Sequence, residues 1–553
     1  MINKEKMCGI SVLFGPAVTK AMLDASIAAL RARGPDASRT EIITCTDLDP
    51  IGIGFSRLHI QGLTGGCEQP FSLSDARIVL CNGEIFNADA LIQTLGLTVP
   101  AGSSDCAVIP ALLEQGLPLT EVCRQLDGDF AIVVVDLASA TVTVARDPYG
   151  VRPLYYGSGG SEGKWRGFVS ELKGFPIAAA AAAVRAVEPG TVMTVCLDGS
   201  RPTTVDTWHQ VPWLKNPSWS NPLEAEAALK VAVEEAVAKR LTTVRQVGAC
   251  LSGGLDSSLV AAIAARLLAA KGQRLHTYSI GMEGSPDLVH ARLVAEHIGS
   301  IHHERIVTGD ECLALIPTVI KAIESFDITT VRASVGNYLV GALVAAETPD
   351  VKVVLNGDGA DEVLGGYLYM RAAPSDLAFE TETTRLLTEI HRYDVLRSER
   401  SMAAHGLESR SPFLDRQFVA TARAIPTKLL RPFGRIEKNV LRLAFANTGL
   451  LPDAVLWRRK EAFSDGISRA EKSWFALAAE AGEAAAATSG SDWRLASTYS
   501  VNRPLTAEAF WYRRLFHSSY DEAAAEAVAP AMWMPRFIVA TDPSARTLAL
   551  YTQ

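Results

Sequence analysis

The chain has 553 residues, of which 48% are apolar and 21% charged, and its net charge at neutral pH is −8. This length exceeds one ordinary hydrophobic core, so we expect a globular protein of two or three domains, and the negative charge argues against nucleic acid or an anionic membrane as a partner. No apolar run reaches membrane-spanning length, and nine cysteines without CxxC spacing fit reduced thiols, so we expect a cytoplasmic protein.

The first apolar stretch, Gly9–Phe14, is predicted to be a strand, and Cys8 stands at its head. If translation starts at Met7 and this methionine is removed, Cys8 carries both a thiol and a free α-amine. A terminal amine titrates near neutral pH, so it can act as the base for its own side chain. The run Met1–Lys6 would block that amine if it stayed attached, and our hypothesis is therefore that Met7 is the true start.

Polar segments follow Cys8 through the first third of the chain, and strands dominate this region. Arg57 follows an apolar stretch, Asn82-Gly83-Glu84 are predicted to end the strand Arg77–Cys81, and Asp105 begins a helix-like run. Three further features belong to this set: the turn Arg33–Asp36, the predicted paired strands 130–136 and 141–145, and the segment Arg146–Gly150. This ordered set resembles the class II glutamine amidotransferases, which are N-terminal-nucleophile (Ntn) hydrolases with a four-layer α/β/β/α sandwich.

The resemblance implies a glutaminase. The Cys8 thiolate would attack the side-chain amide of glutamine, and the Asn82 side chain with the Gly83 N–H would form the oxyanion hole. Hydrolysis would release glutamate and ammonia. The residues implied to bind glutamine are Arg57 on the α-carboxylate, Asn82, and Glu84 and Asp105 on the α-ammonium.

A composition shift marks the boundary between two predicted domains, 8–208 and 209–553. The segment Gln210–Pro222 holds three prolines and two tryptophans, which is typical of a linker, and a helix is predicted at Leu223–Leu241. Strands then alternate with helices, which predicts a doubly wound parallel sheet with ligands at the carboxyl ends of its strands.

The segment Ser252–Ser258, SGGLDSS, lies between a predicted strand, Val247–Leu251, and a predicted helix, Leu259–Ala270. A strand, a glycine-rich turn and a helix N-terminus make an anion site, where Asp256 needs a cation such as Mg²⁺ beside a phosphate. The segment resembles the pyrophosphate loop of the ATP pyrophosphatases. The residues implied to bind ATP are Leu251, Ser252, Gly253, Gly254, Asp256, Ser257, Ser258, Ile280, Gly281, Asn356 and Gly357. Ile280, on the predicted strand Leu275–Met282, fits plain core equally well.

The predicted strand Val351–Leu355 ends in a second glycine-rich and acidic turn, Asn356–Glu362. Carboxylates at the carboxyl end of a strand suit Mg²⁺ and phosphate. This turn is therefore predicted to form the other wall of the nucleotide site, with Asp361 sharing Mg²⁺ with Asp256.

Four later segments narrow the family that the chain resembles: 326–334, 405–415, 457–466 and 542–546. With the rest of the chain they resemble the glutamine-hydrolysing asparagine synthetases of the bacterial type. That family uses Mg²⁺ and ATP to adenylate the β-carboxylate of aspartate, and ammonia from glutamine then displaces AMP. Lys460 is implied to follow the departing pyrophosphate, and Thr329 and Arg332 to hold the aspartate carboxylate. Glutamine, aspartate and ATP are the implied partners, and a homodimer is compatible with the family.

Two positions depart from this family. Where it has Ser-Gly-Glu-Gly, the chain has Asn356-Gly357-Asp358-Gly359, and the catalytic carboxylate at Asp358 reaches about 1.5 Å less far than glutamate. Gly336-Asn337 also replace Pro-Met. An amidotransferase for another carboxylic acid is therefore the main alternative. A β-lactam-forming relative is disfavoured because Cys8, Arg57, Asn82 and Asp105 are all present. A non-enzymatic protein that only binds a nucleotide is the least favoured, since both predicted sites look complete.

Overall fold

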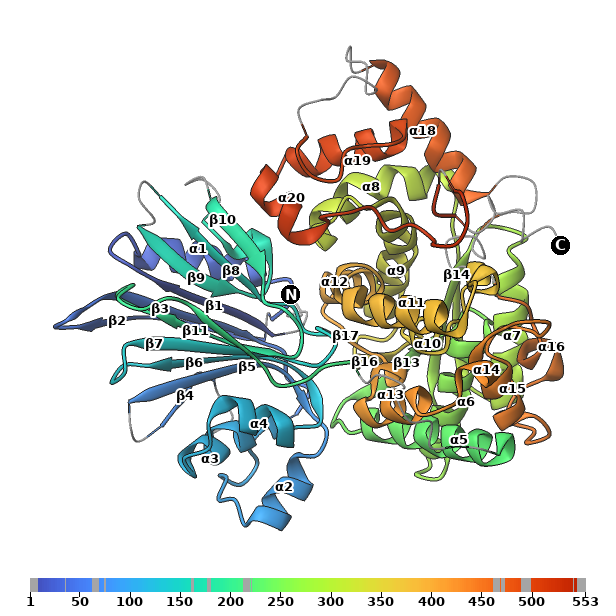
Figure 1. Cartoon of the computed structure of the whole chain (residues 1–553), viewed down its shortest axis with the longest axis horizontal. Helices are drawn as coiled ribbons and strands as arrows, with labels where there is room; N and C mark the ends of the chain where they lie inside the picture. The colour runs from blue at the N-terminus through green and yellow to red at the C-terminus, as the bar shows by residue number, and fades with distance from the viewer. Residues whose placement is uncertain are drawn as a thin grey trace. The chain divides into compact units, whose positions relative to one another are not determined.

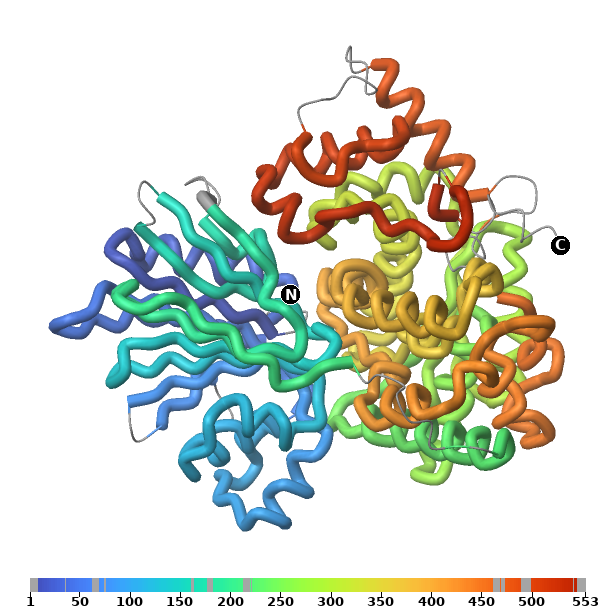
Figure 2. The backbone as a smooth tube through the Cα atoms, in the orientation of Figure 1, coloured from blue at the N-terminus to red at the C-terminus, as the bar shows by residue number. Residues whose placement is uncertain are grey.

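The computed structural model describes residues 8–544 except 35, 62–68, 74–75, 161–163, 177–180, 212–218, 220, 461–467, 469–472, 489–498 and 541. The chain forms two compact units, which Figures 1 and 2 trace from blue to red. Unit 1 comprises Met1–Gln210, Ala403–Glu408 and Tyr520–Val528, and unit 2 comprises Val211–Met402, Ser409–Ser519 and Ala529–Gln553.

Two antiparallel sheets form the middle of unit 1, each with six strands among the described residues. The first has the order β10 (Ala181–Ala186), β8 (Tyr155–Gly159), β9 (Trp165–Val169), β1 (Gly9–Phe14), β3 (Leu48–Arg57), β2 (Ala37–Cys45). The second has the order β12 (Thr204–Thr207), β11 (Thr191–Cys196), β7 (Thr141–Arg146), β6 (Gly128–Asp136), β5 (Arg77–Ile85), β4 (Phe71–Ser72).

The side chains of alternate residues fill the space between these sheets, because successive residues of a strand point to opposite faces. Ile10, Val12 and Phe14 of β1 lie in one buried cluster with Leu80 of β5 and Val133 of β6. Residues that continue these inward-facing series beyond the buried cluster are therefore candidates to line the open end of the space between the two sheets.

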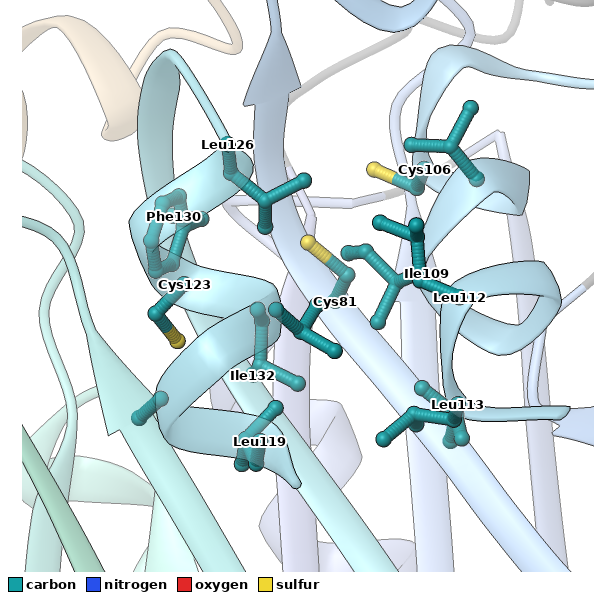
Figure 3. Close-up of a cluster of buried hydrophobic side chains, with 14 of the residues drawn as sticks. Cys81, Cys106, Ile109, Leu112, Leu113, Leu119, Cys123, Leu126, Phe130 and Ile132 are labelled. Atoms are coloured by element: carbon teal, nitrogen blue, oxygen red, sulfur yellow. The ribbon is translucent and has the colours of Figure 1, made fainter. Parts of the chain in front are cut away.

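Helices cover the outer faces of both sheets, as Figure 1 shows. Helix α1 (Lys20–Leu30) packs on β1 and β3, while α2 (Ala88–Leu95), α3 (Val108–Glu114) and α4 (Leu119–Gln125) lie on the side of the second sheet. Figure 3 shows the latter core, where Cys81 and Ile132 of the sheet meet Ile109, Leu112 and Cys123 of the helices. The layers are thus helix, sheet, sheet and helix, and the predicted α/β/β/α sandwich is confirmed.

Among the described residues, unit 2 is built on a five-stranded sheet, with the order β15 (Ile301–Ile306), β14 (His276–Gly281), β13 (Gln246–Cys250), β16 (Val351–Leu355), β17 (Glu408–Arg410). The pairs β15–β14, β14–β13 and β13–β16 are parallel, and the predicted parallel sheet is confirmed. Its helices are α5 (Pro222–Arg240), α6 (Leu255–Ala269), α7 (Pro286–Ile298), α8 (Gly309–Ile323), α9 (Ile328–Glu347), α10 (Ala360–Leu364), α11 (Asp376–Glu389), α12 (Asp394–Ala403), α13 (Arg416–Arg423), α14 (Thr427–Leu430), α15 (Asn439–Phe445), α16 (Asp453–Leu456), α18 (Trp474–Thr488) and α19 (Ala507–His517). Helix α20 (Glu522–Val528) groups with unit 1.

Two sequence-based expectations are corrected. Asn82, Gly83 and Glu84 do not follow the strand but lie within it, since β5 continues to Ile85 through pairing with β6. The second expectation is that no apolar run reaches membrane-spanning length. One described helix, α9, does have the length and mean hydropathy of a membrane span, although 78% of that window is buried within the protein. The start at Met7 and the segments 461–466 and 545–546 lie outside the described residues.

Candidate active sites

The strand alternation of unit 1 places four predicted glutaminase residues on the facing sides of the two sheets. Cys8 continues the inward series of Ile10 and Val12, and it packs against the inter-sheet core. Arg57 continues the inward series of β3, while Asn82 and Glu84 continue that of Leu80 on β5. Gly9 pairs with Ser56, so Cys8 and Arg57 stand at the same end of neighbouring strands.

The Cys8 thiol is held at the backbone of Leu58. Its Sγ accepts a hydrogen bond from the Leu58 N–H at 3.4 Å, and the Nε of Arg33 donates to the Cys8 carbonyl at 2.9 Å. Burial raises the pKa of the Cys8 thiol to about 12, against the smaller effects of the Leu58 N–H and the Arg57 charge. The thiol therefore needs a base close by in order to become a nucleophile.

Asn82 has the geometry of an oxyanion-hole residue. It is 2% exposed, and its side-chain Nδ2 is buried without a hydrogen-bond partner in the described structure. An unpaired buried donor is costly, so its retention points to a ligand that completes it. The neighbouring Gly83 lies so close to β6 that a Cβ atom would stand 2.3 Å from the Asp129 carbonyl oxygen, which requires glycine.

Gln61 links the predicted glutamine-binding residues. The Arg57 guanidinium donates to the Gln61 carbonyl at 3.3 Å, and the Gln61 side-chain amide donates to Glu84 at 2.9 Å. Asp105 accepts the Ile85 N–H at 2.6 Å, which brings its carboxylate to the end of β5. One cation and two carboxylates thus stand near Asn82, as recognition of an amino-acid group requires.

In unit 2, the turn between β13 and α6 has the form predicted for a phosphate loop. Gly253 has a φ of +69°, and a Cβ there would lie 2.5 Å from the Cβ of His290, so the loop can only be built with glycine. Gly254 is the N-cap of α6. The free N–H groups at the start of α6 and the Ser252 and Ser257 hydroxyls, 3.0 Å apart, offer donors to an anion.

A single pocket of unit 2 holds most of the predicted ATP-binding residues. It is lined by Leu251, Ser252, Gly254, Asp256, Ser257, Ile280, Asn356 and Gly357. Gly357 packs against α6 so tightly that a Cβ would stand 2.7 Å from the Ser257 N, and the two predicted walls therefore do meet.

Three predicted residues do not face this pocket. Gly253 and Gly281 shape the loops behind it, and Ser258 is fully buried on the inner side of α6. The helical period explains the last error, because Ser257 and Ser258 differ by about 100° around the helix axis.

Two carboxylates and two ammonium groups meet in the middle of the pocket. The Lys438 Nζ lies 2.5 Å from Asp256 Oδ2 and 2.6 Å from Asp361 Oδ1, and the Lys460 Nζ lies 2.6 Å from Asp361 Oδ2. Although burial opposes it, the charges of Lys438 and Lys460 hold the pKa of Asp361 below its ordinary value. The pKa of Lys460 is raised, since the nearby carboxylates outweigh its burial.

Sequence reasoning missed Lys438. It is 3% exposed and is the N-cap of α15, in the left-handed backbone region with φ 54°. A lone lysine after a loop has no local pattern that distinguishes it from a surface charge, so only the tertiary contact with Asp256 and Asp361 reveals it.

One end of the pocket carries the carboxylates of Asp358 and Asp394 around Arg397. Arg397 of α12 donates to Asp358 Oδ1 at 3.0 Å, to Asp394 Oδ1 at 2.7 Å and to Asn337 Oδ1 at 2.9 Å. Burial raises the pKa of Asp358, and the Arg397 charge opposes this effect. Thr329 also lines this end, and its buried hydroxyl has no hydrogen-bond partner in the described structure.

The structure does not bring Arg332 to the pocket. Its guanidinium binds Glu508 at 2.5 Å and Asp542 at 2.9 Å, and its carbonyl accepts the Trp474 indole N–H at 3.0 Å. Along α9, Arg332 lies about 140° around the helix axis from Asn337. Although it is only three residues from Thr329, its guanidinium turns to Glu508 and Asp542 and not to the pocket. The predicted contact with the acid substrate is therefore corrected to a buried ion pair.

Asn356 lines the pocket, although its side chain is engaged within the protein. It donates to the Ser409 hydroxyl at 2.7 Å, and it accepts from the Ser411 hydroxyl at 2.8 Å and from the Asp358 N–H at 3.1 Å. These bonds fix the turn that carries Asp358.

Comparisons with known proteins match both parts of the chain. A family model described as "Glutamine amidotransferase domain" matches residues 7–225, and one described as "Asparagine synthase" matches 228–381 and 371–540. The chain is 38% identical over 570 residues to a chicken (Gallus gallus) protein named "Asparagine synthetase [glutamine-hydrolyzing]" and 37% identical to those of cattle (Bos taurus) and human (Homo sapiens). In each case the match covers 99% of this chain and 99% of the relative.

Proposed function

Because this chain belongs to the family of glutamine-hydrolysing asparagine synthetases, we propose that it transfers the amide nitrogen of glutamine to the β-carboxylate of aspartate. ATP is cleaved to AMP and pyrophosphate, and glutamate and asparagine are the other products. Unit 1 supplies the nitrogen, and unit 2 activates the acid.

In unit 1, the Cys8 thiolate attacks the side-chain amide of glutamine. The carbonyl oxygen becomes negative in the tetrahedral intermediate, and the unpaired Nδ2 of Asn82 with the Gly83 N–H stabilises that charge. Ammonia leaves, and water then releases glutamate from Cys8. Arg57 with Glu84 and Asp105 orients the amino-acid end of glutamine.

In unit 2, the aspartate β-carboxylate attacks the α-phosphate of ATP and forms β-aspartyl-AMP. A bare carboxylate resists attack by ammonia because its oxygen is a poor leaving group, and adenylation converts that oxygen into a good one. Lys460 and Lys438 carry the positive charge that a departing pyrophosphate needs. Ammonia then attacks the acyl carbon, AMP leaves, and Asp358 takes the surplus proton.

Mg²⁺ fits this pocket through Asp256 and Asp361. Both carboxylates lie within 2.6 Å of the Lys438 ammonium, so a site for positive charge exists between them. Magnesium is commonly held by one or two carboxylates together with substrate phosphates, which matches this small donor set. When bound with ATP, the ion would neutralise charge on the phosphates.

The observation that carries the proposal is the continuity of the pocket in unit 2. One cavity runs from the phosphate loop at Ser252 and Asp256 to an amino-acid-like end with Arg397, Asp394 and Asp358. A protein that only bound a nucleotide would have no need of the second end.

The test is pyrophosphate release measured across a panel of acids, with glutamine or ammonia as the nitrogen source. We expect aspartate to be the preferred acid. Failure of aspartate together with success of another acid would establish the alternative amidotransferase. The Cys8→Ala variant is expected to lose glutamine-dependent synthesis and to keep ammonia-dependent synthesis; loss of both would contradict separate centres.

We further propose that the protein works in the cytoplasm as a homodimer and engages neither nucleic acid nor membrane. The net charge of −8 argues against nucleic acid and anionic membranes as partners. Sedimentation of the purified protein tests the dimer, and cell fractionation tests the location.

A further inference from the structure

We propose that Asn337 is a positioning residue, which acts through Arg397 to hold Asp358 in place for the attack of ammonia on the acyl-adenylate. The inference rests on the proposed function, in which Asp358 accepts the proton.

The three side chains come from three separate elements and meet inside unit 2. Asn337 lies in α9, Asp358 in the turn after β16, and Arg397 in α12. Asn337 is 8% exposed, and the Arg397 and Asp358 side chains are each 13% exposed. All three line the pocket. Because the three side chains are so little exposed, water competes little with the hydrogen bonds between them.

Arg397 divides its donors between two rival carboxylates. Its Nε and NH2 donate to Asp394 at 3.1 Å and 2.7 Å, whereas the same NH2 reaches Asp358 at 3.0 Å. Asp394 is three residues away on the same helix and holds the guanidinium from one side. With these contacts alone, the group could turn about its bonds to Asp394 and lose Asp358.

Asn337 removes that freedom. Its Oδ1 accepts the NH1 of Arg397 at 2.9 Å, at the end of the planar guanidinium opposite to Nε. A planar fork that is held at both ends cannot rotate, so its NH2 stays directed at Asp358 Oδ1. The other oxygen, Oδ2, is buried and accepts no hydrogen bond of good geometry in the described structure, although the Ser398 hydroxyl lies beside this carboxylate. Oδ2 is therefore the atom that can receive a proton.

The proton step follows from this arrangement. The ammonia nitrogen forms a bond with the acyl carbon, a proton passes from that nitrogen to Asp358 Oδ2, and AMP leaves with the electron pair of the broken carbon–oxygen bond. Aspartate is a short side chain, and a base must lie within hydrogen-bond reach of the proton that it takes. Orientation of Oδ2 by a tethered Arg397 therefore controls the rate of this step.

The charges that face Asp358 set its protonation. They are the Arg397 and Lys460 cations, the Asp394 carboxylate and the Cys250 thiol. Burial raises the pKa of Asp358, and the Arg397 charge lowers it. A guanidinium that drifts toward Asp394 would lower this pKa less, so Asp358 would become a usable base only at a higher pH.

The test compares Asn337→Leu, which removes the acceptor at similar volume, with Asn337→Gln, which keeps an amide oxygen. Two half-reactions are measured in the full-length protein: aspartate-dependent exchange of pyrophosphate into ATP, and ammonia-dependent formation of asparagine. We expect Asn337→Leu to slow amination about tenfold to a hundredfold, and to slow exchange much less. Asn337→Gln should recover most of the amination rate.

The pH profile separates positioning from a merely structural role. At constant free ammonia, the acidic limb of the amination rate should move to higher pH in Asn337→Leu. Equal slowing of both half-reactions, or an unmoved limb, would overturn the inference. If Asn337→Leu does not fold, Asn337→Ala gives the same readouts, because alanine suits the helix interior.

Asp358→Asn distinguishes failure of this inference from failure of the proposed function. If Asp358→Asn leaves amination unchanged, the proposed role of Asp358 as the base is wrong. If Asp358→Asn stops amination while Asn337→Leu changes neither the rate nor the pH limb, only the positioning role is wrong.

Discussion

The activity of Cys8 is predicted to depend on removal of the residues before it. The structure partly buries Cys8 beside Leu58, and the loss of solvation raises the pKa of its thiol from 9.0 to about 12. At pH 7.5, the thiolate fraction is then about a thousandfold smaller than for a cysteine with its ordinary pKa, which corresponds to about 4 kcal/mol. A free α-amine on Cys8 itself titrates near neutral pH and can take the thiol proton directly.

Two forms of the protein test this prediction: one that begins at Cys8 after methionine removal, and one that retains Met1–Met7. Glutamate release from glutamine is measured for each, and intact mass confirms each N-terminus. We expect the extended form to hydrolyse glutamine about a thousandfold more slowly. Its ammonia-dependent synthesis serves as the control and should be unchanged. An extended protein that hydrolyses glutamine at the same rate would refute the reasoning.

Three further predictions concern single residues. Asn82→Ala should lower kcat for glutamine hydrolysis by about 10²–10³, because it removes one oxyanion donor, and ammonia-dependent synthesis should be spared; an unchanged kcat would exclude that role. Arg332→Met should cost about 3–5 kcal/mol of stability in denaturant unfolding, because it removes the cation from two buried carboxylates, and Arg332→Lys should cost less. A raised KM for aspartate with normal stability would instead support the prediction from the sequence, in which Arg332 binds the carboxylate of aspartate. Lys438→Met should weaken ATP binding at least tenfold in a KM measurement, since Asp256 and Asp361 would repel phosphate more strongly; equal KM values would show that Lys460 suffices.

The sequence by itself indicated candidate residues for both reaction centres, through a contiguous loop pattern in unit 2 and through strand alternation in unit 1. The phosphate loop at Ser252–Ser258 needs glycine at Gly253 because of its left-handed backbone, and that requirement is legible in the letters. Period-two alternation likewise explains why Cys8, Arg57, Asn82 and Glu84 lie on the facing sides of the two sheets.

The tertiary structure alone decided which charges face the pocket of unit 2. Lys438 stands in the pocket and Arg332 does not, although no local sequence pattern marks either cation as a pocket residue. A charge is stabilised by whatever opposite charge lies near it, and Asp256 lies 182 residues from Lys438 along the chain. A local sequence pattern cannot reveal such a contact, because the packing of whole helices and strands determines which charged side chains lie close together.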